Sequence, residues 1–422
     1  MSHLTSRERQ LGLLTACTAV FTLAGYEALR SSATILLKSA YGPDVLAPAM
    51  TTTPLVILLG LWIYGKLLSA LGPRRTAVAT SLGFAALIVS AYVAVELELR
   101  PATLVLYWLK EFYIVLLIEQ YWSYLNSSLS PFAARRLNGP ITGVAGFGSM
   151  IGGYFVSIAA LPMGTAAMVL VGGLTLLPAA WLINQTYRRF GEVDASKPAL
   201  GLRGAGIGAN LLRSEPQLRA LLAIVLATQM ISSLLELNFQ QLSSLAFEGR
   251  RDAETAFQGQ FWSYLNGAAL LSQFLLTPLL LTRFSLRQAH LLIPVVQLGA
   301  IGWALTEPSL YSVGLAFMAF KVFDYSLFRG AKELIYLPLS FDGRYRTKEL
   351  IDVFGYRTGK AVSSLGVTLL QRFGVELSSL YLPVAFSFCA VWCGLVFPLT
   401  ERRTDENQTP ENLRPPDETD NV

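Results

Sequence analysis

The sequence carries little charge. Lys, Arg, Asp and Glu make up 14% of its 422 residues, whereas a soluble globular protein carries about 25%. Hydrophobic residues supply 53% of the chain. This balance excludes an ordinary soluble domain and indicates a protein that lies mostly in an apolar surrounding such as a lipid bilayer.

Histidine and cysteine are also scarce, with 2 and 3 residues respectively. Cys17, Cys389 and Cys393 lie in apolar segments, where we expect them to pack as small hydrophobic side chains. His3 and His290 lie at the edges of such segments. These positions offer no Cys/His metal site and no Ser-His-Asp triad, so we expect no metal, no cofactor and no enzyme.

Long apolar runs dominate the chain instead. A run of about 20 apolar residues is long enough to cross the hydrocarbon core as a helix, and the first run is too long for a cleaved signal peptide. The sequence predicts twelve membrane-spanning helices. Their expected bounds are 11–37, 46–70, 76–97, 101–126, 140–160, 164–186, 218–245, 259–281, 288–306, 309–330, 350–372 and 378–399.

The 33 Lys and Arg residues are spread unevenly over the predicted loops, and most fall on one face. By the positive-inside rule this face is cytoplasmic and carries both termini. The longest internal polar stretch leaves six spans on each side of it. We therefore expect an N-terminal half at 1–186, a cytoplasmic linker at 187–217, a C-terminal half at 218–399 and a disordered cytoplasmic tail at 400–422.

The loop at 65–75 resembles the signature between helices 2 and 3 of the major facilitator proteins, with Ser69 in place of the usual Asp. A cytoplasmic turn that follows the charge rule explains the same residues. With two halves of six helices, the predicted fold class is an all-α membrane protein of the major facilitator type.

Charged side chains interrupt several predicted spans. A charge at bilayer depth costs at least ~2.5 kcal/mol, so it must face a partner or a wet cavity. Glu27 and Arg30, one turn apart, either neutralise each other or open toward a ligand. Glu236 is the lone acid of a long apolar span, and Glu111 is also deep enough to need a partner.

Two later spans hold further charges. Lys321 and Asp324, one turn apart, are expected to form an ion pair. Arg357 and Lys360 have no acid within a turn on their own helix. Their partners must therefore come from another helix, such as Glu236, or from an anionic substrate, because Arg and Lys are the side chains that bind phosphate.

Two further patterns are interpreted as carrying no site. Arg329, Lys332 and Glu333 are assigned to a cytoplasmic helix end, where charge costs little. The pentapeptide Trp-Ser-Tyr-Leu-Asn occurs at 122–126 and again at 262–266. It joins spans that the arrangement in two halves does not relate, and we interpret it as coincidence.

Two runs match a known pattern in order and spacing: 332–339, K-E-L-I-Y-L-P-L, and 352–360, D-V-F-G-Y-R-T-G-K. They resemble the stretches after helix 10 and in helix 11 of the bacterial and plastid ATP/ADP translocase family. The segment 234–237, L-L-E-L, resembles the surroundings of its helix 7 acid. The segments 107–112 and 257–261 resemble parts of its helices 4 and 8.

The resemblance implies a twelve-helix major facilitator fold that exchanges adenine or other nucleotides. It puts Glu111, Glu236 and Lys360 where the family has residues needed for transport. It also matches Arg30 to the Arg of a helix 1 motif, L-R-D-x-K-D. Ala33 stands where that motif has its Lys, and this departure leaves the identity of the substrate open.

The predicted substrate-binding residues are Arg30, Glu111, Glu236, Arg357 and Lys360, and the predicted ligand is a small anion, above all a nucleotide. We expect a monomeric exchanger that works by alternating access in the bacterial inner membrane, with no nucleic-acid partner. A proton-coupled carrier of the same fold, with Glu236 as the proton carrier, is the alternative. A membrane-embedded enzyme or a non-transporting protein is a third interpretation, and no catalytic constellation supports it.

Overall fold

The computed structural model describes residues 4–192, 212–337, 339 and 347–401, and the side chains at 131, 349, 353, 354 and 357 are outside that description. Helices make up nearly all of the described chain, and it contains no strand. The expected linker and tail fall partly outside the described residues, at 193–211 and 402–422.

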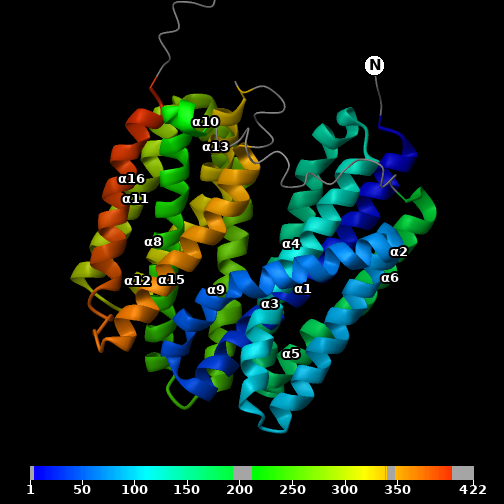
Figure 1. Cartoon of the computed structure of the whole chain (residues 1–422), viewed down its shortest axis with the longest axis horizontal. Helices are drawn as coiled ribbons and strands as arrows, with labels where there is room; N and C mark the ends of the chain where they lie inside the picture. Colours follow the sequence, from blue (N-terminus) through cyan, green and yellow to red (C-terminus); the bar gives the residue numbers. More distant parts are fainter. Residues whose placement is uncertain (1–3, 193–211, 338, 340–346, 402–422) are drawn as a thin grey trace, which may run out of the picture.

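The described chain forms two groups of helices that lean against each other (Figure 1). The N-terminal group contains α1 (Ser6–Tyr41), η1 (Pro43–Val45), α2 (Leu46–Glu96), α3 (Arg100–Ser128), α4 (Pro131–Met163), α5 (Thr165–Leu174) and α6 (Leu176–Phe190). The C-terminal group contains α8 (Pro216–Ala246), α9 (Arg251–Leu271), η3 (Ser272–Leu276), α10 (Thr277–Arg283), α11 (Leu286–Thr306), α12 (Leu310–Phe323), η4 (Asp324–Phe328), α13 (Arg329–Tyr336), η5 (Glu349–Gly355), α15 (Tyr356–Arg372) and α16 (Tyr381–Leu399).

Ten segments of the described residues are helices long and apolar enough to cross a membrane. The difference from twelve expected spans arises at two places. Pro43–Glu96 counts as one segment but holds two expected spans, which lie on either side of a turn at Gly72. The φ of 75° and ψ of 170° at this turn favour glycine. The span expected at 350–372 is divided between η5 and α15, and α15 has only 17 residues. The predicted all-helical fold class is therefore confirmed for the described chain.

Local sequence explains where several helices begin. Thr5 and Glu8 form a capping box at the start of α1, and Ser285 and Gln288 form another at the start of α11. Each box satisfies backbone N–H groups that have no partner inside the helix. The apolar runs that follow supply the surface that packs against neighbouring helices or faces lipid.

The two groups meet where α9 packs against α1 and α4 and where α2 packs against α15. Small residues permit the closest approach. A Cβ atom added to Gly153 of α4 would lie 2.8 Å from the carbonyl oxygen of Gly259 in α9, which is too close for a side chain at either position. Such small-residue contacts are the usual means of helix packing in lipid.

The two groups converge at the end of the molecule away from the N-terminus (Figure 1). There Lys38 of α1 lies 2.6 Å from Glu254 of α9, and Asp252 accepts hydrogen bonds of 2.8 and 2.6 Å from the amide and hydroxyl of Thr165. At the opposite end, the side-chain hydrogen bonds of the described residues stay within one group. Among the described residues, side-chain bonds thus latch the two groups of helices together at one end, which we call the closed end.

Candidate functional site

Arg30 lies on the inner part of α1, between an acid and an aromatic ring. Its Nη1 atom is 3.6 Å from Oε1 of Glu27, and its guanidinium carbon is 3.2 Å from the ring centre of Trp262 in α9. Asn266, one turn after Trp262, donates a 3.0 Å hydrogen bond to the same Glu27 oxygen. An arginine over a tryptophan face gains a cation–π attraction, so α1 and α9 together hold Arg30 in place.

Lys110 and Glu111 form a second ion pair on α3. The Lys110 Nζ atom lies 2.7 Å from Oε1 of Glu111 and 4.0 Å from the ring centre of Tyr107. Lys110 is buried, whereas 19% of the Glu111 side chain remains accessible. The pair therefore presents its carboxylate, and not its ammonium group, to the accessible space.

Glu236 and Lys360 form a third pair, between α8 and α15. Their closest atoms, Oε2 and Nζ, are 3.4 Å apart. Gly359 lets the two helices approach, because a Cβ atom there would lie 2.8 Å from Cβ of Gln229. The side chains of Glu236 and Lys360 are 17% and 32% accessible. Lys360 has no acid within a turn on its own helix, and its counter-ion was expected on another helix. The structure confirms this, because Glu236 belongs to α8.

The three pairs interact with one another. Glu111 interacts electrostatically with Lys360 and Arg30, and Glu236 interacts with Lys110. Charges from α1, α3, α8 and α15 thus converge on one partly accessible group, which we call the charge cluster: Glu27, Arg30, Lys110, Glu111, Glu236 and Lys360. An anion entering the charge cluster can replace the carboxylate partners of Arg30 and Lys360. Both bases then keep a partner of opposite charge, and a paired charge costs less to desolvate than an unpaired one.

The structure brings four of the five predicted site residues together: Arg30, Glu111, Glu236 and Lys360. Arg357 belongs to the first turn of α15, and its side chain lies outside the described part of the chain. Ala33, the position that departs from the helix 1 motif, is fully buried in an apolar cluster with Leu29, Leu36 and Phe84. Position 33 of this chain therefore faces the interior of the N-terminal group.

The expected ion pair between Lys321 and Asp324 is wrong. The helix changes from α12 to the π-helical turn η4 at Asp324, and the wider turn alters which side chains share a face. Asp324 instead accepts a 3.4 Å hydrogen bond from the hydroxyl of Tyr356. The Nζ atom of Lys321 lies near aromatic rings, 5.7 Å from the ring centre of Tyr325.

The expectation that the charge of Lys332 costs little at a helix end is also wrong. Lys332 is buried in α13, and its Nζ atom is 2.8 Å from Oδ1 of Asp352 in η5. The hydroxyl of Tyr336 donates a 3.1 Å hydrogen bond to the same oxygen. These contacts tie η5 to α13 within the C-terminal group, so the K-E-x-x-Y and D-V-F-G runs meet in space.

Sequence reasoning missed Trp262 and Asn266. Both belong to the second copy of the repeated pentapeptide, which was interpreted as coincidence, and they contact Arg30 and Glu27. The available signal was their spacing of one turn, which matches the spacing of Glu27 and Arg30 on the helix that they face. Spacing alone does not say which helices are neighbours.

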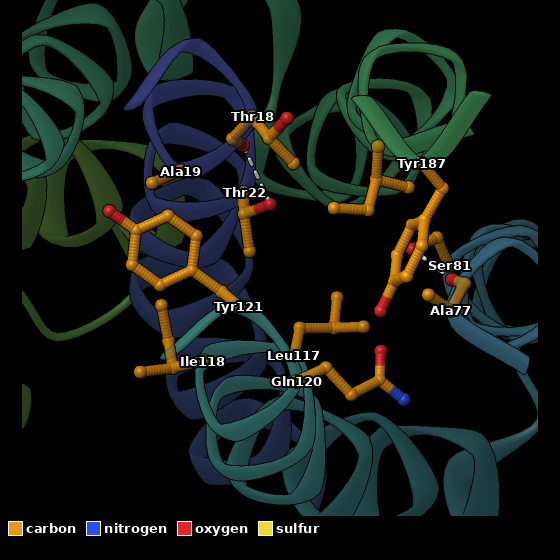
Figure 2. Close-up of a pocket in the computed structure, with 11 residues that line it drawn as sticks. Thr18, Ala19, Thr22, Ala77, Ser81, Leu117, Ile118, Gln120, Tyr121 and Tyr187 are labelled. Atoms are coloured by element: carbon orange, nitrogen blue, oxygen red, sulfur yellow. Dashed lines mark hydrogen bonds between the residues drawn. The ribbon is translucent and has the colours of Figure 1, made fainter. Parts of the chain in front are cut away.

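A separate pocket lies inside the N-terminal group (Figure 2). Gln120 and Tyr187 point toward each other across it, and Thr18 and Thr22 line one wall. No charged side chain lines this pocket, so it does not offer the ion pairs that an anion site needs. Among the residues that the structure describes, no group of three His, Cys, Asp or Glu side chains is placed to hold a metal ion.

Comparison with known proteins gives one similarity of sequence and several of fold. No family model matches the chain. The chain is 25% identical over 228 residues to ADP,ATP carrier protein 1 of Chlamydia pneumoniae, an alignment that covers 47% of this chain and 44% of the carrier. The chain thus spans less than half the length of the curated relative it matches.

Solved structures match over most of their length. The nucleoside transporter NupG matches with a TM-score of 0.67 at 11% identity, covering 92% of this chain and 98% of its own. A bacterial homologue of the iron transporter ferroportin matches in its inward-facing state with a TM-score of 0.68 at 14% identity, covering 93% and 99%. Its outward-facing state matches with 0.56 at 15% identity, covering 93% and 100%.

These matches define the class of protein. The chain is an integral membrane protein with an all-α fold of the major facilitator type. In sequence it is similar to an ADP,ATP carrier. At such low identities the solved structures carry the fold alone.

Proposed function

We propose that this protein is a secondary transporter of the ATP/ADP translocase family that exchanges nucleotides or another phosphorylated anion by alternating access. The observation that carries the proposal is the charge cluster. Bases from α1 and α15 lie partly accessible beside acids that an anionic substrate can displace. Guanidinium and ammonium groups are the protein's means of holding phosphate.

Similarity to known proteins supports the same substrate class. The related carrier is named for ADP and ATP, and a neighbour in fold is named for nucleosides. The runs that resemble the translocase family include the segments that hold Glu236 and Lys360. A phosphorylated anion brings the negative charge that these bases require in a low-dielectric site.

The latch at the closed end supports alternating access. Lys38 binds Glu254 and Gln240 across the two groups of helices, while the other end has no such bond among the described side chains. The fold is also more similar to the inward-facing than to the outward-facing state of the ferroportin homologue. We infer an inward-open state, with 1–186 and 218–399 as the two moving halves.

The ion pair of Glu236 favours exchange over proton coupling. A proton carrier needs an acid that is free to bind and release a proton in the absence of a competing cation. Glu236 lies 3.4 Å from the Lys360 ammonium group and is therefore not such a free acid. In the proposed cycle, substrate phosphate takes the place of Glu236 beside Lys360.

We propose that the protein is a monomer of the bacterial inner membrane with both termini in the cytoplasm, since the basic loops lie on the side of the termini. The closed end then faces outward. No nucleic-acid partner is needed for the proposed activity.

A thermal-unfolding screen tests the substrate class. The detergent-solubilised protein is heated with ATP, ADP, GTP, a sugar phosphate, inorganic phosphate or a neutral nucleoside. A ligand that binds the folded state alone raises the midpoint of unfolding with its concentration. We expect nucleotides to stabilise the protein and the nucleoside to do so weakly. Stabilisation by the nucleoside alone, or by none of the compounds, contradicts the proposal.

A further inference from the structure

Lys321 is a base near the charge cluster that forms no ion pair with any acid the structure describes. The described acids of the cluster are matched one to one with bases: Glu27 with Arg30, Glu111 with Lys110 and Glu236 with Lys360. None of the ion pairs among the described side chains includes Lys321. The charge cluster and Lys321 together therefore contain three acids and four bases, one base more than acids.

Contacts connect Lys321 with the side of the charge cluster formed by Arg30. The Nζ atom of Lys321 lies 5.8 Å from the ring centre of Phe317. The ring of Phe317 lies 5.7 Å from that of Trp262, on which Arg30 is stacked. Lys321 also interacts electrostatically with Glu236. Lys321 and Arg30 are thus two cations beside one group of neighbouring aromatic rings.

The acid nearest to Lys321 in sequence belongs to a different group of charges. Asp324 is buried and accepts a hydrogen bond from Tyr356, whose hydroxyl lies 3.5 Å from Lys332. Arg329 interacts electrostatically with the same tyrosine. Asp324 therefore has cations other than Lys321 near its own partner.

An unpaired cation inside a membrane protein has a high free energy unless a ligand supplies the missing charge. The surrounding rings reduce this cost only in part, since a cation–π contact contributes about 0.5–2 kcal/mol. We propose that Lys321 is a substrate-binding residue and that its counter-ion is the anionic part of the transported molecule. This assignment rests on the proposed function and adds a third base to Arg30 and Lys360.

Two cations beside one group of rings suit a ligand with charge spread over several oxygens. A chain of two or three phosphoryl groups offers more anionic oxygens to Arg30, Lys321 and Lys360 than a single phosphate does. We therefore infer a preference for polyphosphate over monophosphate anions.

The test compares Lys321→Gln with wild type and with Lys66→Gln. Lys66 is an exposed lysine whose Nζ atom lies 3.6 Å from the ring centre of Trp62. Lys66→Gln is therefore a matched control, because it also removes a lysine from an aromatic ring but outside the charge cluster. Without ligand, we expect Lys321→Gln to unfold at the same temperature as wild type or a higher one. Its affinity for inorganic tripolyphosphate and for ATP should fall about tenfold, as for the loss of one charged hydrogen-bonding partner, whereas Lys66→Gln should bind both as wild type does.

The outcomes separate the two proposals. If wild type binds ATP or tripolyphosphate and Lys321→Gln binds them equally well, the role of Lys321 is wrong and the proposed function stands. A lower unfolding temperature of Lys321→Gln without ligand would show that Lys321 has an internal counter-ion, which also overturns the inference. If neither anion binds to wild type, the proposed function fails together with the role of Lys321.

A measurement on the wild-type protein does not depend on how the variant folds. Lysines are labelled with a small amine-reactive reagent, with and without tripolyphosphate, and the labelled positions are read by mass spectrometry. We expect the labelling of Lys321 to fall at least severalfold with the anion present, while that of Lys66 stays constant. Equal labelling of Lys321 in both samples, under conditions where the anion stabilises the protein, would contradict the inference.

Discussion

The guanidinium group of Arg30 stacks on the indole of Trp262, with 3.2 Å between the guanidinium carbon and the ring centre. The two residues belong to α1 and α9, which come from different groups of helices. The contact therefore connects the groups at the charge cluster. It fixes the direction of a base that has one acid, Glu27, beside it.

The first prediction concerns this contact. Trp262→Phe keeps an apolar ring but weakens the cation–π attraction, which contributes about 0.5–2 kcal/mol. Arg30 then loses its fixed direction, and we expect the affinity for the anion that stabilises wild type to fall about three- to tenfold. Binding measured by titration checks this. Trp303→Phe, at a half-exposed position of α11, is the control, and equal affinity in all three proteins would contradict the account.

The second prediction concerns Glu236 and Lys360. Lys360→Gln leaves the Glu236 carboxylate without its partner, and we expect a loss of about 1–3 kcal/mol of stability. This is less than the ~3–5 kcal/mol of a fully buried pair, because a third of the Lys360 side chain is accessible. The double variant Glu236→Gln with Lys360→Gln should regain most of that stability and no transport. A double variant that transports would show that the pair is only structural.

The third prediction concerns the latch at the closed end. Lys38 is buried and binds both Gln240 and Glu254, so Lys38→Gln removes the charge that holds α1 to α9. We expect this end to open more often, since the equilibrium between two states follows their difference in contacts. Spin labels at 98 and 248, two exposed positions at this end, should report a population at longer distance.

The control for the latch is Arg100→Gln, which changes an exposed base at the same end. It should leave the distance distribution unchanged, because it breaks no bond between the groups of helices. If Lys38→Gln also leaves the distribution unchanged, the latch does not set the balance between the two states.

The fourth prediction concerns the crossing of α4 and α9. A Cβ atom at Gly153 would lie 2.8 Å from the Gly259 oxygen and 2.9 Å from the Ser263 nitrogen. Gly153→Ala should therefore destabilise the protein by about 1–3 kcal/mol, as overpacking does. Gly139→Ala on the same helix meets nothing within 4 Å and should be neutral or stabilising, since Ala favours helix over Gly. Equal effects at both positions would contradict the role of this contact.

The fold could be predicted from the sequence because an apolar run long enough to cross a membrane has few other structures open to it. The expected spans at 46–70 and 76–97 fall on either side of Gly72, where the backbone of α2 turns. Hydropathy does not reveal changes within a helix, however. The π-helical turns η3, η4 and η5 have no signal in an apolar pattern.

The candidate site could be predicted only in part. The partner of Lys360 was expected on another helix because its own helix has no acid nearby, and the structure pairs it with Glu236. The pairing of Lys321 with Asp324 failed because it assumed a continuous α-helix, and η4 begins at Asp324. The neighbour of Arg30 could not be found, since the sequence does not say that α9 faces α1 at Trp262.

Exchange in proteoliposomes tests the central claim most directly. Labelled ATP is offered to vesicles that contain the protein and are either loaded with unlabelled ADP, empty, or given a pH gradient. The account predicts uptake into the loaded vesicles alone, and its loss in Lys360→Gln. Uptake that follows the pH gradient without internal nucleotide, or no nucleotide uptake under any of the three conditions, would contradict it.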